Sequence, residues 1–191
     1  LGVILQSRGQ HREATEHFQA ALRQRPDYAA ARLRLASSLR RLGKPDEALE
    51  QYQSVITSNP DNSEADVGYA MTLVQLGRYD EAAKRFAEEM RVHPEQPQFA
   101  HGLARLLAAA PDARVRNGQR AMTIVQGLIK QGRTLELGET MAMTLAELGE
   151  YQRAAAVQRD LLKAAEGSGL QSVVQRLSAN LKLYEQGRPC R

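Results

Sequence analysis

The residues that first suggest chemistry in this chain are its four histidines. A zinc site needs His, Cys or carboxylate side chains gathered at ligand spacing. His11 and His17 are six residues apart, which places them on different faces of one helix, and a proline turn separates His93 from His101. No cluster of cysteines or carboxylates surrounds either pair at ligand spacing. We therefore predict no metal site.

Nucleophilic and phosphate-binding sites are also absent from the pattern. Gly167-Ser168-Gly169 lacks the spacing of a nucleophile elbow and follows a predicted helix, whereas that elbow needs a preceding strand. The other glycines stand singly at predicted turns, so no phosphate-cradling loop is expected. Cys190 is the only cysteine and lies one residue from the end, where we expect a frayed tail and no disulfide. We predict no catalytic residue and no cofactor, and we look for function on a surface.

The elements that make up this surface are repeats of 34 residues. Leucines, glycines, prolines and small residues recur at that interval without gaps. The aligned columns include Leu5, Leu39, Leu73 and Leu107; Gly9, Gly43 and Gly77; Ala14, Ala48 and Ala82; Phe18, Tyr52 and Phe86; and Pro26, Pro60 and Pro94. A unit of this length with small residues at fixed places is typical of helix–turn–helix repeats, which bury their apolar face only against their neighbours.

One unit can be derived from elementary physical chemistry. Residues 29–41 carry apolar side chains at helical spacing, and Gly43 follows them as a C-terminal glycine does. A second helix is predicted over residues 45–57. Pro45 needs no hydrogen-bond partner in a first turn, acidic residues favour that turn, and Pro60 closes the helix. Neither helix is stable alone, so stacking must stabilise the pair.

The quoted columns resemble the tetratricopeptide repeat family. The motif of a large then a small apolar residue, a turn glycine, a small residue, an aromatic and a closing proline occurs twice in succession. It reads Leu35-Ala36, Leu39, Gly43, Ala48, Tyr52, Val55 and Pro60, then Tyr69-Ala70, Leu73, Gly77, Ala82, Phe86 and Pro94. Two positions depart from it, Pro45 where Tyr79 would correspond and Glu89 where Val55 would. The resemblance implies an all-α fold, a right-handed α-solenoid of antiparallel helix pairs.

The repeat register predicts a single solenoid domain over residues 1–191. Its parts are a truncated repeat 1–28, repeats 29–62 and 63–96, repeat 97–134 with a four-residue insertion near Pro111, repeat 135–167, and a capping helix 169–186. Leu1-Gly2 aligns with Leu35-Ala36, so we expect the sequence to be an excised fragment. The ending Tyr-x-x-Gly-Arg-Pro resembles the carboxyl terminus of repeat modules that bacteria append to larger membrane or secreted proteins.

Composition and charge exclude several functional classes. The chain lacks an initiating Met, a signal peptide and an apolar run of membrane-spanning length, so we predict no direct membrane insertion, and a cytoplasmic and a periplasmic location both stay open. The net charge of +4 comes from 26 basic and 22 acidic residues, and aromatic residues make up only 5%. That balance, without aromatic stacking platforms, argues against nucleic-acid binding.

The resemblance implies that the first helix of each repeat lines a concave groove for a peptide or partner helix. We predict a peptide-binding set with basic residues flanking an apolar floor. Its members are Arg34, Ser37, Arg41, Val67, Met71, Val74, His101 and Arg105. Arginine grips carboxylates bidentately, and methionine and Gly68 would let the floor adapt and a ligand backbone approach. The expected partner is a protein or peptide with an acidic residue or a chain-terminal carboxylate. Glu136, Glu139 and Glu147 are expected to form an acidic end.

Three functional hypotheses follow from these residues. The first is a non-catalytic interaction scaffold that binds a peptide or protein segment in the groove. The second is an accessory carboxyl-terminal repeat module of a larger enzyme or membrane protein. The third is self-assembly through the first repeat or the inserted loop, in which a contact that does not close produces filaments.

Overall fold

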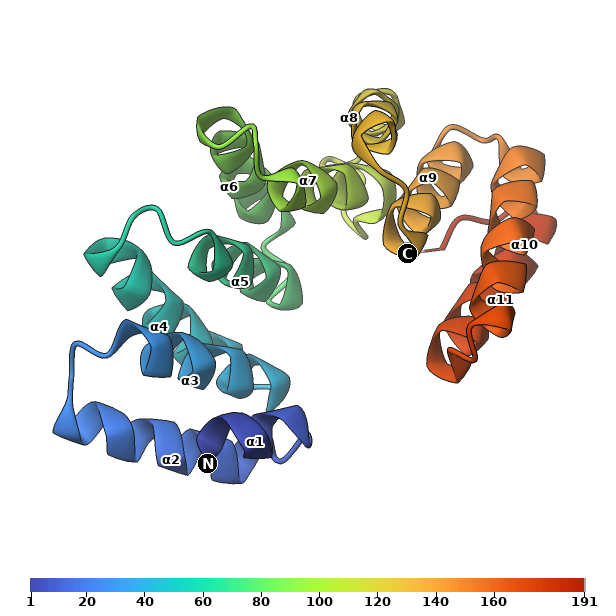
Figure 1. The fold of residues 1–191 in the computed structure, drawn as a ribbon. Helices are drawn as coiled ribbons and strands as arrows, with labels where there is room; N and C mark the ends of the chain where they lie inside the picture. The colour runs from blue at the N-terminus through green and yellow to red at the C-terminus, as the bar shows by residue number, and fades with distance from the viewer. Residues whose placement is uncertain (191) are drawn as a thin grey trace. The chain divides into compact units, whose positions relative to one another are not determined.

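The computed structural model describes residues 1–190, and these residues contain eleven α-helices and no strand. Successive helices form antiparallel pairs (Figure 1). The helices are α1 (Gly2–Ser7), α2 (His11–Gln24), α3 (Ala29–Arg41), α4 (Pro45–Ser58), α5 (Ser63–Gln75), α6 (Tyr79–Val92), α7 (Pro97–Ala109), α8 (Gly118–Gln131), α9 (Leu135–Glu147), α10 (Tyr151–Gly167) and α11 (Gln171–Glu185). The predicted α-solenoid of five helix pairs and a capping helix is confirmed.

The turn inside a repeat is set by its glycine. After α3, Gly43 has a φ of 73°, a left-handed value that side chains other than glycine rarely adopt. The Gly43 N–H donates to the Arg40 carbonyl at 3.3 Å, and the Lys44 N–H donates to the Leu39 carbonyl at 3.0 Å. These two bonds satisfy carbonyls that the helix end would otherwise leave free. The chain therefore reverses at a fixed angle into α4, with Pro45 in its first turn as predicted.

The inserted segment of the fourth repeat is an ordered turn rather than an open loop. Without a turn glycine, the chain leaves α7 at Ala110, and the Asn117 N–H donates back to the Leu107 carbonyl at 2.8 Å. The Asn117 side chain then caps α8 by accepting from the Arg120 N–H at 2.9 Å. Arg116 donates to the Ala110 carbonyl at 2.8 Å. Side-chain hydrogen bonds thus replace the missing glycine.

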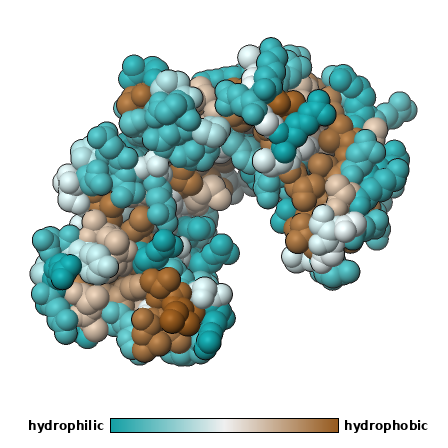
Figure 2. All heavy atoms as spheres, viewed as in Figure 1, coloured by the Kyte–Doolittle hydropathy of each residue, from teal (hydrophilic) through white to brown (hydrophobic). Residues whose placement is uncertain are grey.

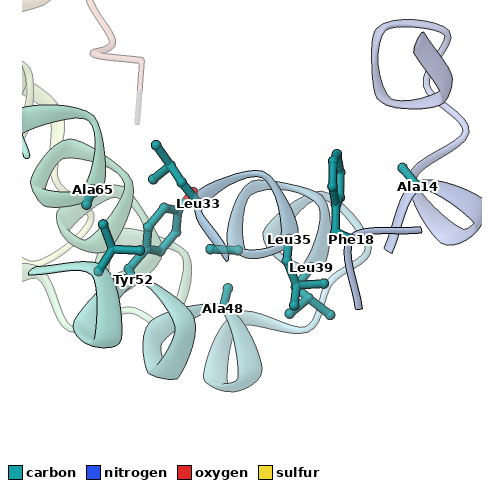
Figure 3. Packing of buried hydrophobic residues seen from close by; sticks show 10 residues of the cluster. Ala14, Phe18, Leu33, Leu35, Leu39, Ala48, Tyr52 and Ala65 are labelled. Carbon is teal, nitrogen blue, oxygen red and sulfur yellow. The ribbon is translucent and has the colours of Figure 1, made fainter. Parts of the chain in front are cut away.

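The chain comprises two compact units, residues 1–85 (unit 1) and 86–191 (unit 2), and each is described by itself. In unit 1, alanines sit where helices cross, and aromatic rings fill the space between successive pairs (Figure 3). Ala36 and Ala48 are fully buried, as is nearly all of Tyr52. Small residues let helix backbones approach closely, and each large buried side chain contributes about 1.5–3 kcal/mol. That the whole sequence acts as a single domain stays a prediction.

In unit 2 the aromatic column ends in a polar residue. Gln158 of α10 stands where Phe18, Tyr52 and Phe86 stand in earlier repeats, and it is fully buried. Its Nε2 donates to the Leu177 carbonyl of α11 at 3.0 Å. A buried hydrogen bond thus joins α10 to the capping helix at a position where Phe18, Tyr52 and Phe86 place an aromatic ring.

Candidate binding surface on the first helices

Side-chain amides connect the first helices of unit 1. Gln6 of α1 donates from Nε2 to the Arg34 carbonyl at 3.2 Å and to Ser38 Oγ at 3.0 Å on α3. Gln75 of α5 donates in the same way to the Arg40 carbonyl at 3.3 Å. These bonds fix α1 and α5 on either side of α3, so side chains from neighbouring repeats present a common surface.

Six of the eight predicted binding residues lie on α3 and α5, which contact each other. We call them the first-helix surface of unit 1: Arg34, Ser37 and Arg41 of α3, and Val67, Met71 and Val74 of α5. The two arginines are exposed, Met71 is 39% exposed, and the other three residues are half-buried. Arg34 Nη1 lies 3.8 Å from Glu64 Oε1 at the edge of α5, and both side chains are about half exposed.

Gly68 does not serve this surface in the way the sequence suggested. A Cβ atom placed on Gly68 would collide with the ring of Tyr52 from the preceding repeat. Gly68 is itself buried, so it makes room for the protein's own aromatic side chain rather than for the backbone of a ligand. Gly102 of unit 2 does the same for Phe86.

His101 and Arg105, the other two predicted binding residues, lie on α7 in unit 2. His101 Nε2 is 2.8 Å from Thr140 Oγ1 on α9, and the Thr140 hydroxyl donates to the Glu136 carbonyl at 2.9 Å. Thr140 therefore accepts from His101. Partial burial, and next the charge of Arg105, lower the pKa of His101 below its usual value. His101 is thus a neutral donor at neutral pH and adds no positive charge to the surface.

Arg105 belongs to a network around the buried carboxylate of Glu139, which we call the Glu139 cluster. Arg176 of α11 binds both carboxylate oxygens, with Nε 3.0 Å from Oε1 and Nη2 3.1 Å from Oε2. Asn180 Nδ2 donates to Oε1 at 3.3 Å, and Arg105 Nη1 lies 3.8 Å from Oε2. Glu139 is 1% exposed, and these side chains compensate its buried negative charge inside the protein.

The expected acidic end is therefore wrong at two of its three positions. Glu139 is buried in its cluster, and Glu147 pairs with Arg116, whose Nε lies 3.0 Å from Glu147 Oε1. The sequence places acids and arginines on these helices, but it does not say which of them meet across 31 to 37 residues. The positive charge of Arg105 is likewise partly neutralised by Glu139, 3.8 Å away.

The frayed tail expected at the carboxyl end is also wrong. Cys190 is 7% exposed, and its Sγ lies 2.9 Å from Oη of Tyr184, which is itself buried. Burial is the main cause that raises the pKa of both groups, so both are neutral near pH ~7. The sequence offered one signal for this contact, because Tyr184 ends the apolar stripe of the capping helix.

Two pockets border these helices in unit 2. One of about 350 Å³ lies beside His101, between the ends of α7, α8 and α9, and its wall includes Pro97, Leu128 and Leu137. The other, of about 710 Å³, lies beside α10 and α11 and includes the pair Arg159–Glu185, joined at 2.8 Å.

Metal-binding clusters and membrane-spanning helices are both missing from residues 1–190. In that part of the chain no group of three or more His, Cys, Asp or Glu side chains could hold a metal ion. Within the same range, every helix is too short or too polar to cross a membrane.

Comparison with known proteins gives two family matches. Two family models, each described as Tetratricopeptide repeat, match residues 1–63 and residues 39–106. None of the curated proteins matches the sequence.

Several solved structures share this fold. A tetratricopeptide repeat protein from Parabacteroides merdae is 18% identical, with a TM-score of 0.73 over 97% of this chain and 71% of its own. A thermophilic TPR protein of Thermus thermophilus is 19% identical, with a TM-score of 0.74 over 94% of this chain and 96% of its own. PilF of Pseudomonas aeruginosa is 21% identical, with a TM-score of 0.69 over 95% of this chain and 87% of its own. At these identities the likeness shows the fold alone.

Proposed function

Because the chain belongs to the tetratricopeptide repeat family, we propose that it is a non-catalytic scaffold that binds a peptide or protein segment on the first helices of its repeats. The observation that carries the proposal is the first-helix surface of unit 1. There Met71 is exposed between two half-buried valines, and two exposed arginines lie on the adjacent helix. An apolar strip bordered by cations suits a segment that alternates apolar and acidic groups.

The chemistry of this surface favours a carboxylate-bearing partner. Arg41 makes no ion pair with any residue of the described chain, and the contact of Arg34 with Glu64 is long and solvent-exposed. Exposed pairs of this kind contribute about 0–1 kcal/mol, so a ligand carboxylate competes with Glu64 at little cost. The guanidinium fork binds carboxylates bidentately, and Met71 can adapt its flexible side chain to the apolar part of a ligand.

Unit 1 rather than unit 2 is proposed to carry the charge recognition. His101 is neutral and Arg105 lies beside the buried Glu139, so the pair offers less free positive charge than the arginines of α3. Nucleic acid is not proposed as a partner, because 22 acidic residues nearly balance the 26 basic ones and aromatic residues make up only 5% of the sequence.

The test compares two double variants with equal change in charge. Arg34→Glu with Arg41→Glu reverses the charge of the surface, and Arg12→Glu with Arg23→Glu does so on the exposed side of α2. We expect the wild type and the α2 variant (Arg12→Glu, Arg23→Glu) to capture the same partners from the source cell. The α3 variant (Arg34→Glu, Arg41→Glu) should not capture them. Two charge-assisted bonds of about 1.5 kcal/mol each correspond to a loss of affinity of at least about a hundredfold.

Isothermal titration calorimetry with the captured segment then gives the affinities. Circular dichroism checks that both variants stay helical. Equal affinity of the α2 and α3 variants would remove the basis for the proposed surface.

A second candidate function, self-assembly, is favoured by the exposed side of α1. Val3 and Ile4 are 57% and 52% exposed, and Leu1 is still more exposed. Figure 2 shows a hydrophobic patch in the region of α1. A second copy of the chain would bury these side chains. Light scattering over a range of concentrations tests this, with Ile4→Glu against Val92→Glu, which changes an equally exposed apolar residue on α6. Association that both variants retain would argue against α1 as the contact.

A further inference from the structure

Residues 187–190 fold back onto the rest of unit 2. Gly187, with a φ of 68°, follows α11 and reverses the backbone, and the Arg188 N–H donates to the Leu183 carbonyl at 2.9 Å. Residues 188–190 are not helical, and Pro189 and Cys190 become progressively buried. We call residues 187–190 the C-terminal tail. Figure 1 shows it leaving α11 and running toward α9.

The tail is seated by its cysteine. Sγ of Cys190 lies 2.9 Å from Oη of Tyr184 and is the hydrogen-bond partner of this buried phenol. A buried hydroxyl without a partner costs stability, so this contact holds the tail in place. The Glu139 cluster lies nearby, because Arg176 and Asn180, which bind Glu139, precede Tyr184 at four-residue intervals on the same face of α11. The tail therefore rests where side chains of α7, α9 and α11 converge.

This position coincides with the unit 2 part of the predicted peptide-binding set. Arg105 is one of that set, and it lies 3.8 Å from the carboxylate of Glu139, which Arg176 on the Tyr184 face of α11 also binds. A partner segment that approached Arg105 along the first helices would meet the tail first. The tether is short, and short linkers give effective concentrations in the millimolar range, so the tail competes strongly with any free segment.

We propose that the C-terminal tail is an intramolecular occupant of the first-helix side of unit 2, seated by Cys190 against Tyr184, and that a partner segment reaches Arg105 only after the tail leaves. The proposal rests on the proposed function for its second half, whereas the seating of the tail is tested without any partner. The tail also indicates what this side of unit 2 accepts: a non-helical segment with a small, weakly polar side chain after a proline. The apparent affinity of a partner is proportional to the fraction of molecules in which the tail has left its docked position.

Thiol reactivity measures the seating directly, because Cys190 is the only cysteine. The full chain is treated with iodoacetamide, and alkylation is followed by mass spectrometry over a range of pH. The matched control is the double variant Gln186→Cys with Cys190→Ser, which moves the thiol to an exposed position four residues earlier. At equal thiolate fraction we expect Cys190 to react at least about tenfold more slowly. Equal rates would overturn the proposal.

A second measurement tests the occupancy. The probe is a fluorescent synthetic peptide of residues 185–191, kept reduced, and its binding is measured by fluorescence anisotropy. Cys190→Arg should expel the protein's own tail, because a large charged side chain would replace a thiol that is only 7% exposed. We expect this variant to bind the probe at least about tenfold more tightly than the wild type and than Cys190→Ser. No binding to any protein, or equal binding to all, would overturn the proposal.

Controls distinguish release of the tail from unfolding and from loss of partner binding. Circular dichroism verifies that Cys190→Arg is folded. Tyr184→Phe provides a milder variant, which keeps the ring and removes the hydroxyl. Compared with the wild type at equal thiolate fraction, it should speed alkylation of Cys190 severalfold. If it does not, the seating contact is refuted. Loss of partner binding in the α3 arginine variant concerns the proposed function and leaves both tail measurements unchanged.

Discussion

Replacing Gly102 by alanine should destabilise the protein, although alanine is the better helix former. A Cβ atom on Gly102 would lie 2.6 Å from both Cε1 and Cζ of Phe86 and 3.0 Å from Cδ1. Carbon atoms pack optimally at about 3.5–4.0 Å. The Phe86 ring is 1% exposed, so it has no solvent-filled space into which to move. The added methyl group must displace either the ring or α7.

The size of the effect is the sum of two opposing contributions. Overpacking of a well-packed core costs about 1–3 kcal/mol. The change from glycine to alanine inside a helix returns about 1 kcal/mol. Gly102→Ala should therefore lower the free energy of unfolding by about 1 kcal/mol. Gly127 is the matched control in the same unit, because nothing lies within 4 Å of a Cβ placed there. Gly127→Ala should raise the free energy of unfolding by up to about 1 kcal/mol.

Thermal unfolding followed by circular dichroism compares the two variants. In a chain of this size 1 kcal/mol corresponds to about 2–4 °C in Tm. We expect Gly127→Ala to melt a few degrees above the wild type and Gly102→Ala to melt below it. Phe86→Leu, measured alone and together with Gly102→Ala, should reduce the cost of the added methyl group. If Gly102→Ala stabilises the protein as much as Gly127→Ala does, the contact with Phe86 does not explain why this position is glycine.

Other perturbations test other parts of the structure. Ala48→Leu should cost about 1–3 kcal/mol in urea unfolding, because Ala48 is fully buried where helices cross, and a native-like midpoint would refute that role. Gln158→Leu should leave the free energy of unfolding unchanged or raise it by about 1 kcal/mol, because the buried Oε1 of Gln158 has no hydrogen-bond partner among the described residues. A loss of about 2 kcal/mol would mean instead that the bond from Gln158 to Leu177 anchors the capping helix α11. The pKa of His101 is lower in the folded than in the unfolded protein, so the unfolded state binds more protons and the free energy of unfolding should fall from pH ~7 to ~5. His101→Gln should weaken this fall. An identical pH dependence in the variant would contradict the lowered pKa of His101.

The helices and their turns were predictable because local interactions set them. The left-handed conformation at Gly43 and the proline at the start of α4 act within a few residues of themselves. The columns of leucine and alanine repeat with the same period as the helix pairs that bury them. The fourth repeat was predictable only as a longer loop, because the bonds of Asn117 and Arg116 that order it join residues the pattern does not pair.

The candidate surface was only partly accessible to sequence reasoning. Register alone assigns Arg34, Met71 and Arg105 to first helices, and the structure has them there. Register does not reveal that Arg105 lies beside Glu139, or that Gly68 accommodates Tyr52. These contacts depend on how successive pairs stack, and small differences in stacking decide which of several possible partners a long side chain meets.

The sequence by itself determined the repeat length, the helix pairs, the glycine turns and the identity of the residues on the first helices. All of these follow from helical periodicity and backbone conformation, which depend on neighbouring residues. Only the tertiary structure decided which charges remain available and where the tail rests. Arg176 reaches Glu139 across 37 residues, and Cys190 comes to the α11 tyrosine near the Glu139 cluster only because α9 and α11 lie close together. Burial and charge pairing are properties of that packing, and they set the chemistry of the surface.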